Sequence, residues 1–146
     1  MTNIPIKKLR EGAIFPTYAT AQSAGADLYA CPDGPVTLKP HETVMIPLGY
    51  SMAIPAGWVG LIFARSGLAS KRDLAPANKV GVVDADYRGE WFIPLHNHGS
   101  EPQTVQPGER IAQLVIVPCL AAAFTEVDEL DETARGAGGF GSTGTN

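Results

Sequence analysis

The amino-acid sequence predicts an all-β protein, and three observations carry this prediction. Sixteen glycines and twelve prolines are spread through the 146 residues, so few windows are long enough for an amphipathic helix. Short runs of β-branched and aromatic residues alternate with turn residues at regular spacing. Hydrophobic residues make up 45% of the chain and charged residues 18%, as is typical of a globular domain with a core. We therefore expect a sandwich or a jelly-roll-like β-barrel.

The expected elements are short and closely spaced. One short helix is predicted at 67–71, where the chain leaves a strand. The composition turns acidic and then glycine-rich after residue 130, so we expect a β-domain over 1–130 and, over 131–146, a flexible glycine-rich C-terminal arm of the same domain. The predicted strands, in chain order, are 4–9, 26–30, 36–39, 43–54, 58–64, 80–84, 90–97, 104–105, 110–117 and 124–127.

Charge and cysteine content exclude several classes of function. The formal net charge of −4 argues against binding nucleic acid or a membrane by bulk electrostatics, because both favour a basic surface. Cys31 and Cys119 are far apart and belong to no Cys-x-x-Cys pair, which indicates neither a disulfide scaffold nor a zinc knuckle. The first twelve residues lack the apolar centre of a secretory leader. A reducing, cytoplasmic location is therefore expected.

The stretch 80–92 is the strongest candidate for a site of chemistry. A β-branched run enters a turn rich in Asp and Gly and leaves it through the aromatic pair Trp91 and Phe92, which is typical of a hairpin. Asp84 ends the apolar strand, so its carboxylate would be held rigidly, as a general base should be. The alternative is that Asp84 and Asp86 are ordinary turn residues.

Three further stretches each allow a structural and a functional interpretation. Asp27, among small residues in 24–30, is either a surface residue or a group that faces a cation. Arg65 and Ser66 stand where a strand meets the predicted helix, which suits either anion binding or a plain helix cap by Ser66. Gln113 lies in an apolar strand, so its amide is either structural or directed at a ligand or water.

Two other patterns are weaker. His96 and His98 lie on one face of a predicted strand, but a metal site with two ligands and no third is incomplete. The run 136–141 matches Gly-x-Gly-x-x-Gly, yet no helix could follow it, so it is not a dinucleotide fingerprint. An arm with Arg135 and Phe140 could nevertheless hold phosphate and stack on a base, which is worth about 1–3 kcal/mol. The alternative is a linker.

Taken together and in this order, five motifs resemble those of the trimeric deoxyuridine triphosphate nucleotidohydrolase (dUTPase) family over residues 24–144. They read Ala-Gly-Ala-Asp-Leu-Tyr-Ala, Arg-Ser-Gly-Leu-Ala, Gly-Val-Val-Asp-Ala-Asp-Tyr-Arg-Gly-Glu, Gly-Glu-Arg-Ile-Ala-Gln-Leu and Arg-Gly-x-Gly-Gly-Phe-Gly-Ser-Thr-Gly. The chain departs from the common pattern at Ala64, where many relatives have Pro, and at Trp58, where Tyr is commoner. Neither position has a predicted chemical role.

The resemblance implies a dUTPase-like (β-clip) jelly-roll barrel, assembled as a homotrimer with active sites between subunits. It also implies Mg²⁺-dependent hydrolysis of dUTP to dUMP and pyrophosphate, which limits uracil in DNA and supplies dUMP for thymidylate synthesis. By the same resemblance Asp84 activates the attacking water, Tyr87 packs against the deoxyribose, and Asp27 reaches through water to a Mg²⁺ ion held mainly by the substrate phosphates. The other substrate-binding positions implied are Arg65, Ser66, Gly67, Asn78, Gly81, Val82, Val83, Phe92, Gln113, Arg135, Phe140, Gly141, Ser142 and Thr143.

Two alternatives stay open at this point. A dCTP deaminase of the related fold uses an Arg-Ser-Ser motif and a strand glutamate, whereas here Gly67 follows Ser66 and the stretch 91–97 has no glutamate. The second alternative is a trimer that binds dUTP for regulation and does not catalyse its hydrolysis. The presence of the general base, the cations and the arm argues against it.

Overall fold

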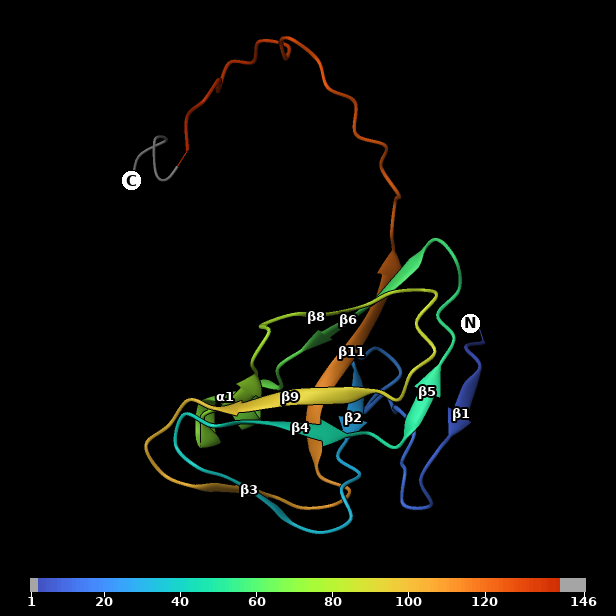
Figure 1. Cartoon of the computed structure of the whole chain (residues 1–146), viewed down its shortest axis with the longest axis vertical. Coiled ribbons are helices and arrows are strands. Elements are labelled where there is room, and N and C mark those ends of the chain that lie inside the picture. The colour runs from blue at the N-terminus through green and yellow to red at the C-terminus, as the bar shows by residue number, and fades with distance from the viewer. Residues whose placement is uncertain (1–2, 140–146) are drawn as a thin grey trace.

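The computed structural model describes residues 3–139 and consists mainly of β-strands with one short helix, which confirms the predicted fold class. Figure 1 shows the strands gathered into one body from which the C-terminal segment departs. The elements are β1 (Ile6–Lys8), β2 (Ala26–Tyr29), β3 (Val36–Leu38), β4 (Thr43–Pro47), β5 (Tyr50–Met52), β6 (Trp58–Phe63), α1 (Ser66–Arg72), β7 (Leu74–Pro76), β8 (Gly81–Val83), β9 (Phe92–Asn97), β10 (Gln103–Val105) and β11 (Arg110–Pro118).

The largest sheet has the strand order β2-β11-β6-β8, and every pairing in it is antiparallel. Its central strand β11 places Gln113 opposite Asp27 on one side and opposite Phe63 on the other. Three of the sequence motifs therefore meet at one end of this sheet, although they are far apart in the sequence. β8 forms the opposite edge and pairs with β6 through Gly60↔Val83 and Ile62↔Gly81.

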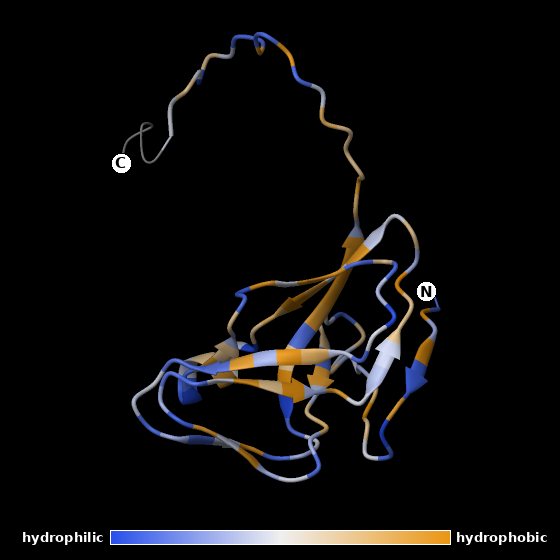
Figure 2. Cartoon of the chain, in the orientation of Figure 1, coloured by the Kyte–Doolittle hydropathy of each residue, from blue (hydrophilic) through white to orange (hydrophobic). Residues whose placement is uncertain are grey.

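The core follows the two-residue period of the strands. Along β9 the residues Ile93, Leu95 and Asn97 are fully buried while those between them are partly exposed. In Figure 2 the hydrophobic colour alternates with hydrophilic colour along β9 and covers most of β11. The buried amide of Asn97 is satisfied, because its Nδ2 donates to the carbonyls of Leu38 and Glu101.

Several predicted elements need correction. The strands form four separate sheets over residues 3–139, so the predicted barrel is not closed. The predicted strand 43–54 is two strands, because Gly49 lies between them with φ +77°, a left-handed conformation that ends the extended run. The helix is longer than predicted and ends at Asp73 with φ 52°. The strand β7 was not predicted.

The predicted strand 124–127 is wrong. Between the end of β11 at Pro118 and residue 139 the chain has no helix or strand, and it leaves the body of the domain (Figure 1). Leu120 and Phe124 are 91% and 97% exposed, so this segment buries almost none of its apolar surface within its own chain. None of the helical structure in residues 3–139 is long and apolar enough to cross a membrane.

Candidate active site

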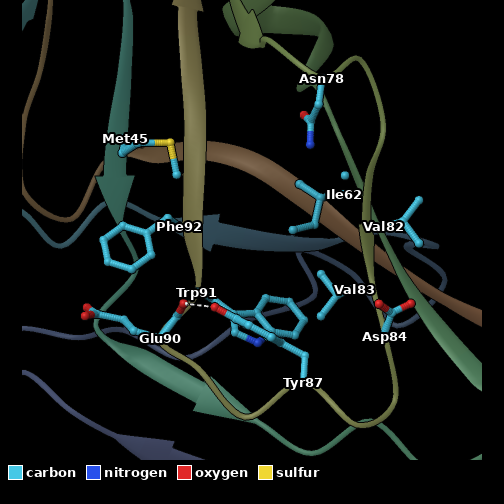
Figure 3. A pocket seen from close by; sticks show the side chains of 11 residues that line it. Met45, Ile62, Asn78, Val82, Val83, Asp84, Tyr87, Glu90, Trp91 and Phe92 are labelled. Atoms are coloured by element: carbon cyan, nitrogen blue, oxygen red, sulfur yellow. Dashed lines mark hydrogen bonds between the residues drawn. The ribbon is translucent and has the colours of Figure 1, made fainter.

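A cavity of about 250 Å³ lies between β8, the turn that follows it and the start of β9 (Figure 3). The predicted base Asp84 lines it together with all the described residues predicted to contact the uracil or the sugar, which are Asn78, Gly81, Val82, Val83, Tyr87 and Phe92; Gln113, predicted to contact phosphate or the attacking water, does not. Four lining residues were not predicted, namely Met45, Ile62, Glu90 and Trp91. The cavity is thus bounded by apolar and aromatic side chains with a few polar groups, which suits a small ring.

The backbone of β8 sets the shape of this cavity. A Cβ atom on Gly81 would lie 3.1 Å from Ile62 Cβ and 3.3 Å from Asn78 Nδ2, so the absence of a side chain lets Asn78 approach the strand. Asp84 directly follows β8 and has an exposed side chain. In Figure 3 it lies across the cavity from Phe92. A carboxylate anchored by a paired strand and open to solvent can hold and deprotonate a water molecule.

Tyr87 is fixed by two hydrogen bonds within the turn. Its backbone N–H donates to the Asp84 carbonyl at 3.2 Å, and its hydroxyl donates to the Glu90 carbonyl at 2.9 Å (Figure 3). A Cβ atom on Gly89 would collide with the Tyr87 ring and hydroxyl, so only glycine at 89 allows this ring position. The turn therefore holds an aromatic wall at the edge of the cavity.

A second cavity, of about 540 Å³, is polar and lies at the other end of the large sheet. Of the described residues predicted to hold phosphate, all except Arg135 line this cavity. Asp27, predicted to reach the metal ion through water, lines it as well. Its lining residues are Ala19, Ser23, Ala24, Gly25, Asp27, Arg65, Ser66, Gly67 and Gln113. Ser66 is the first residue of α1 and not its cap, because the N-cap position is occupied by Arg65, which makes no side-chain cap hydrogen bond.

Asp27 is buried between two guanidinium groups. One carboxylate oxygen accepts a hydrogen bond from Arg65 Nε at 2.8 Å and the other from Arg110 Nη1 at 3.1 Å, and Asp27 is 8% exposed. The surface interpretation of Asp27 is therefore wrong. Arg110 was given no role from the sequence, although it stands in the fourth motif; only the pairing of β11 with β2 brings it to Asp27.

Gln113 has a fixed side chain at the floor of the second cavity. Its Nε2 donates to the Ala64 carbonyl at 2.8 Å, directly before Arg65. A Cβ atom on Gly25 would collide with the Gln113 carboxamide, so glycine is required there. The structural interpretation of Gln113 is confirmed by this hydrogen bond, and the contact with a ligand or water stays a prediction for a side chain that lines the cavity.

His96 of β9 and His98, just beyond its end, form a pair of neighbouring rings. Their ring centroids are 4.4 Å apart, and His96 Nδ1 shares a hydrogen bond with the Thr43 hydroxyl at 2.8 Å. Desolvation and the neighbouring His96 lower the pKa of His98. Residues 3–139 contain no group of three or more His, Cys, Asp or Glu side chains that could hold a metal ion.

The C-terminal arm is only partly described. Arg135 donates from Nε to the Gly138 carbonyl at 2.9 Å and lines neither cavity. The predicted contacts Phe140, Gly141, Ser142 and Thr143 lie outside the described residues.

An all-β domain that carries a ring-sized cavity beside a strand-anchored carboxylate, and a separate cavity lined by arginine, serine and glutamine, defines a nucleotide-processing enzyme. A family model described as dUTPase matches residues 11–144. The chain belongs to the dUTPase family, and this confirms the predicted enzyme class, a dUTP diphosphatase.

Individual relatives support the same assignment. The chain is 50% identical over 141 residues to the deoxyuridine 5'-triphosphate nucleotidohydrolase of Syntrophotalea carbinolica, covering 97% of this chain and 96% of the relative. It is 52% identical over 133 residues to that of Desulfitobacterium hafniense, covering 90% and 88%. The solved structure of Staphylococcus bacteriophage 80alpha dUTPase with dUPNHPP superposes with a TM-score of 0.91 at 29% identity, covering 99% of this chain and 100% of that one.

Proposed function

We propose that this chain hydrolyses dUTP by in-line attack of a water molecule on the α-phosphorus, with Asp84 as the general base. Asp84 takes a proton from the water as the new oxygen–phosphorus bond forms, and the bond to the β-phosphate oxygen breaks to release pyrophosphate and dUMP. The observation that carries the proposal is that Asp84 and all the described residues predicted for the uracil and sugar line one cavity. Positioning supplies most of the rate in such chemistry.

Selectivity for a uracil deoxynucleotide would come from the walls of this cavity. Main-chain groups of β8 and the Asn78 amide offer fixed donors and acceptors to a base. A base with the wrong pattern would leave buried polar groups unpaired, which can cost orders of magnitude in rate. The Tyr87 ring would leave no space for a 2′-hydroxyl.

The triphosphate needs local cations. It carries about −4 and the protein has a formal charge of −4, and at 4 Å each unit pair contributes about 4 kcal/mol at an effective dielectric near 20. Arg65 lines the polar cavity, and Arg135 would be brought by the arm. Mg²⁺ would neutralise phosphate charge when bound. Residues 3–139 provide no carboxylate cluster for it, which fits an ion that is held mainly by the substrate.

Asp27→Asn tests which role Asp27 plays. Its oxygens already accept hydrogen bonds from Arg65 and Arg110, so we expect the loss of the carboxylate to release Arg65 and to raise KM for dUTP by about tenfold. The Mg²⁺ concentration that gives half-maximal rate should not change if Asp27 acts through the guanidinium. A marked rise in that concentration would instead support the predicted water-mediated contact with the ion. Arg110→Gln is the companion variant and should show the same pattern.

The active sites are proposed to lie between subunits of a homotrimer, and the sheet register supports this. Val83 pairs with Gly60, so Asp84 lies opposite Val59, whereas Arg65 lies six residues further along the same direction. Six residues of extended chain span about 20 Å, which is much longer than a triphosphate. This separation supports a site that takes Asp84 and Arg65 from different copies.

The arm supports the same assembly. Leu120 and Phe124 are almost fully exposed, and the segment leaves its own domain (Figure 1). Several large exposed apolar side chains close together mark a surface that contacts another protein. A second copy that received this segment would bury them and would bring Arg135 to a neighbouring site.

The proposed function is tested by measuring pyrophosphate release. We expect Mg²⁺-dependent release from dUTP and little from dTTP, dCTP or UTP, and the purified protein should have the mass of a trimer in light scattering. Ammonia release from dCTP would establish the deaminase instead. Binding of dUTP without turnover would establish the regulatory alternative.

A further inference from the structure

Arg10 and Glu90 form a two-point ion pair across eighty residues of sequence. Arg10 Nε donates to Glu90 Oε1 at 2.7 Å, and Nη2 donates to Oε2 at 3.4 Å. The side chains are 35% and 20% exposed. The hydrogen bond that Arg10 donates to the Glu90 carboxylate raises the pKa of the guanidinium. A fork of this kind fixes the orientation of both groups and not merely their distance.

The arginine end of the pair is held by the backbone. The N–H groups of Leu9 and Arg10 both donate to the Gly49 carbonyl, at 2.8 and 3.1 Å. Gly49 has φ +77°, and a Cβ atom there would lie 2.8 Å from Ala13 Cβ and 2.9 Å from Cys31 Sγ. The N-terminal segment is therefore packed tightly against the 49–50 junction.

The glutamate end rests on the same junction. Trp91, the next residue, donates its N–H to the Tyr50 carbonyl at 2.9 Å, and its own carbonyl accepts from Leu48 at 2.9 Å. The backbone of 90–91 is therefore fixed from one side by strand-like hydrogen bonds. The Arg10 fork fixes Glu90 from the other side.

Glu90 transmits this restraint to the cavity. Its carbonyl accepts the Tyr87 hydroxyl at 2.9 Å, and the carboxylate in Figure 3 points away from the Asp84 side of the cavity. The Glu90 carboxylate is thus engaged outside the cavity while its backbone holds Tyr87 inside it. Arg10 does not line the cavity, so its effect would pass through Glu90.

We propose that Arg10 is a positioning residue, which holds Tyr87 against the deoxyribose through Glu90 and thereby sets the selectivity for dUTP over UTP. This inference rests on the proposed role of Tyr87 as the sugar wall. Asp84 is held separately by β8, so the attacking water is not expected to depend on Arg10. The signature of the role is a change in KM and in sugar selectivity at a nearly constant kcat.

The test compares kcat and KM for dUTP and UTP in Arg10→Ala, Arg10→Lys and Glu90→Gln. If the Tyr87 ring moves, the enzyme loses the close fit to the sugar that excludes a 2′-hydroxyl. The ratio of kcat/KM for dUTP to that for UTP should therefore fall about tenfold in Arg10→Ala. Lysine keeps the charge but not the fork, and glutamine keeps the shape but not the charge, so both variants should lie between Arg10→Ala and the wild type. Asp33→Asn is the matched control. Asp33 contacts Arg10 at 3.7 Å but is 98% exposed, so its loss should change nothing.

A double variant separates positioning from general destabilisation. Tyr87→Phe removes the hydroxyl that bonds to Glu90, so adding Arg10→Ala to it should lower selectivity much less than Arg10→Ala does alone. Thermal unfolding identifies any variant that fails to fold. If Arg10→Ala is such a variant, the selectivities of Arg10→Lys and Glu90→Gln test the inference in its place.

Three outcomes would overturn the inference, and they differ in what they say about the sugar-wall role of Tyr87. If Tyr87→Ala alters selectivity while Arg10→Ala and Glu90→Gln behave like Asp33→Asn, the positioning role is overturned and the proposed function stands. If Tyr87→Ala leaves selectivity unchanged in an active enzyme, the sugar-wall role itself fails and the inference fails with it. A loss of kcat at constant selectivity in Arg10→Ala also overturns the inference.

Discussion

Replacing Asp84 by asparagine is expected to lower kcat for dUTP by about 10²–10⁴-fold, the range that a positioned general base contributes. The amide has almost the shape of the carboxylate but cannot accept a proton from water. Asp84 follows a strand that is paired with β6 at three positions, so the exchange of one exposed side-chain atom should not disturb the fold. Single-turnover release of pyrophosphate measures the chemical step directly.

Binding provides the control for this prediction. The non-cleavable analogue dUpNHpp should bind Asp84→Asn as tightly as it binds the wild type, because Asp84 is proposed to act on the water and not to hold the substrate. Asp86→Asn is the matched variant, since this second acid of the same turn does not line the cavity. If Asp84→Asn keeps its full rate while Asp86→Asn loses it, the base has been assigned to the wrong carboxylate.

The parts of the site that could be predicted from sequence are local in the chain. The predicted hairpin at 80–92 is wrong, because β8 pairs with β6 whereas β9 pairs with β4 and β7 in another sheet. The predicted turn is present, and its backbone hydrogen bond from Tyr87 to the Asp84 carbonyl keeps these two residues close together. Arg65 and Ser66 at the start of α1 are likewise a local feature. Such features depend on turn chemistry and on strand periodicity, both of which can be read in a short window.

The features that were missed depend on pairing between distant strands. Met45 reaches the cavity because β4 pairs with β9, where it lies opposite Pro94. The partners of Asp27 lie 38 residues away (Arg65) and 83 residues away (Arg110), and Arg10 lies 80 residues from Glu90. A single sequence contains no local signal for such contacts.

The wrong strands have an equally physical cause. The segment 124–127 has β-branched and aromatic residues but no partner strand within the described chain, and β-propensity depends mainly on packing against neighbours. In 43–54 the apolar pattern continues through the bend at Gly49. Hydrophobic pattern therefore predicted the strands better than it predicted their ends.

Removal of residues 135–146 is expected to lower turnover of dUTP by about 10²–10³-fold while the trimer stays intact. The deleted stretch contains Arg135 and the four arm positions implied by the family resemblance, which together would hold the terminal phosphate and cover the base. The last strand ends at Pro118, and every buried hydrophobic residue identified precedes that point, so the core is untouched. Leu120 and Phe124 also remain in the truncated chain.

Light scattering and steady-state kinetics separate the two halves of this prediction. A truncation of 145–146 alone is the control and should keep full activity, because it spares every predicted contact. Arg135→Gln in the full-length chain should lose less turnover than the truncated protein does. It removes one cation but keeps the residues proposed to cover the base. If the truncated protein dissociates, the arm is needed for assembly of the trimer. If it stays trimeric and fully active, the arm has no role in catalysis. We expect an intact but slow trimer. This result would mean that the contacts of the arm stabilise the complex with bound substrate and not the folded trimer itself.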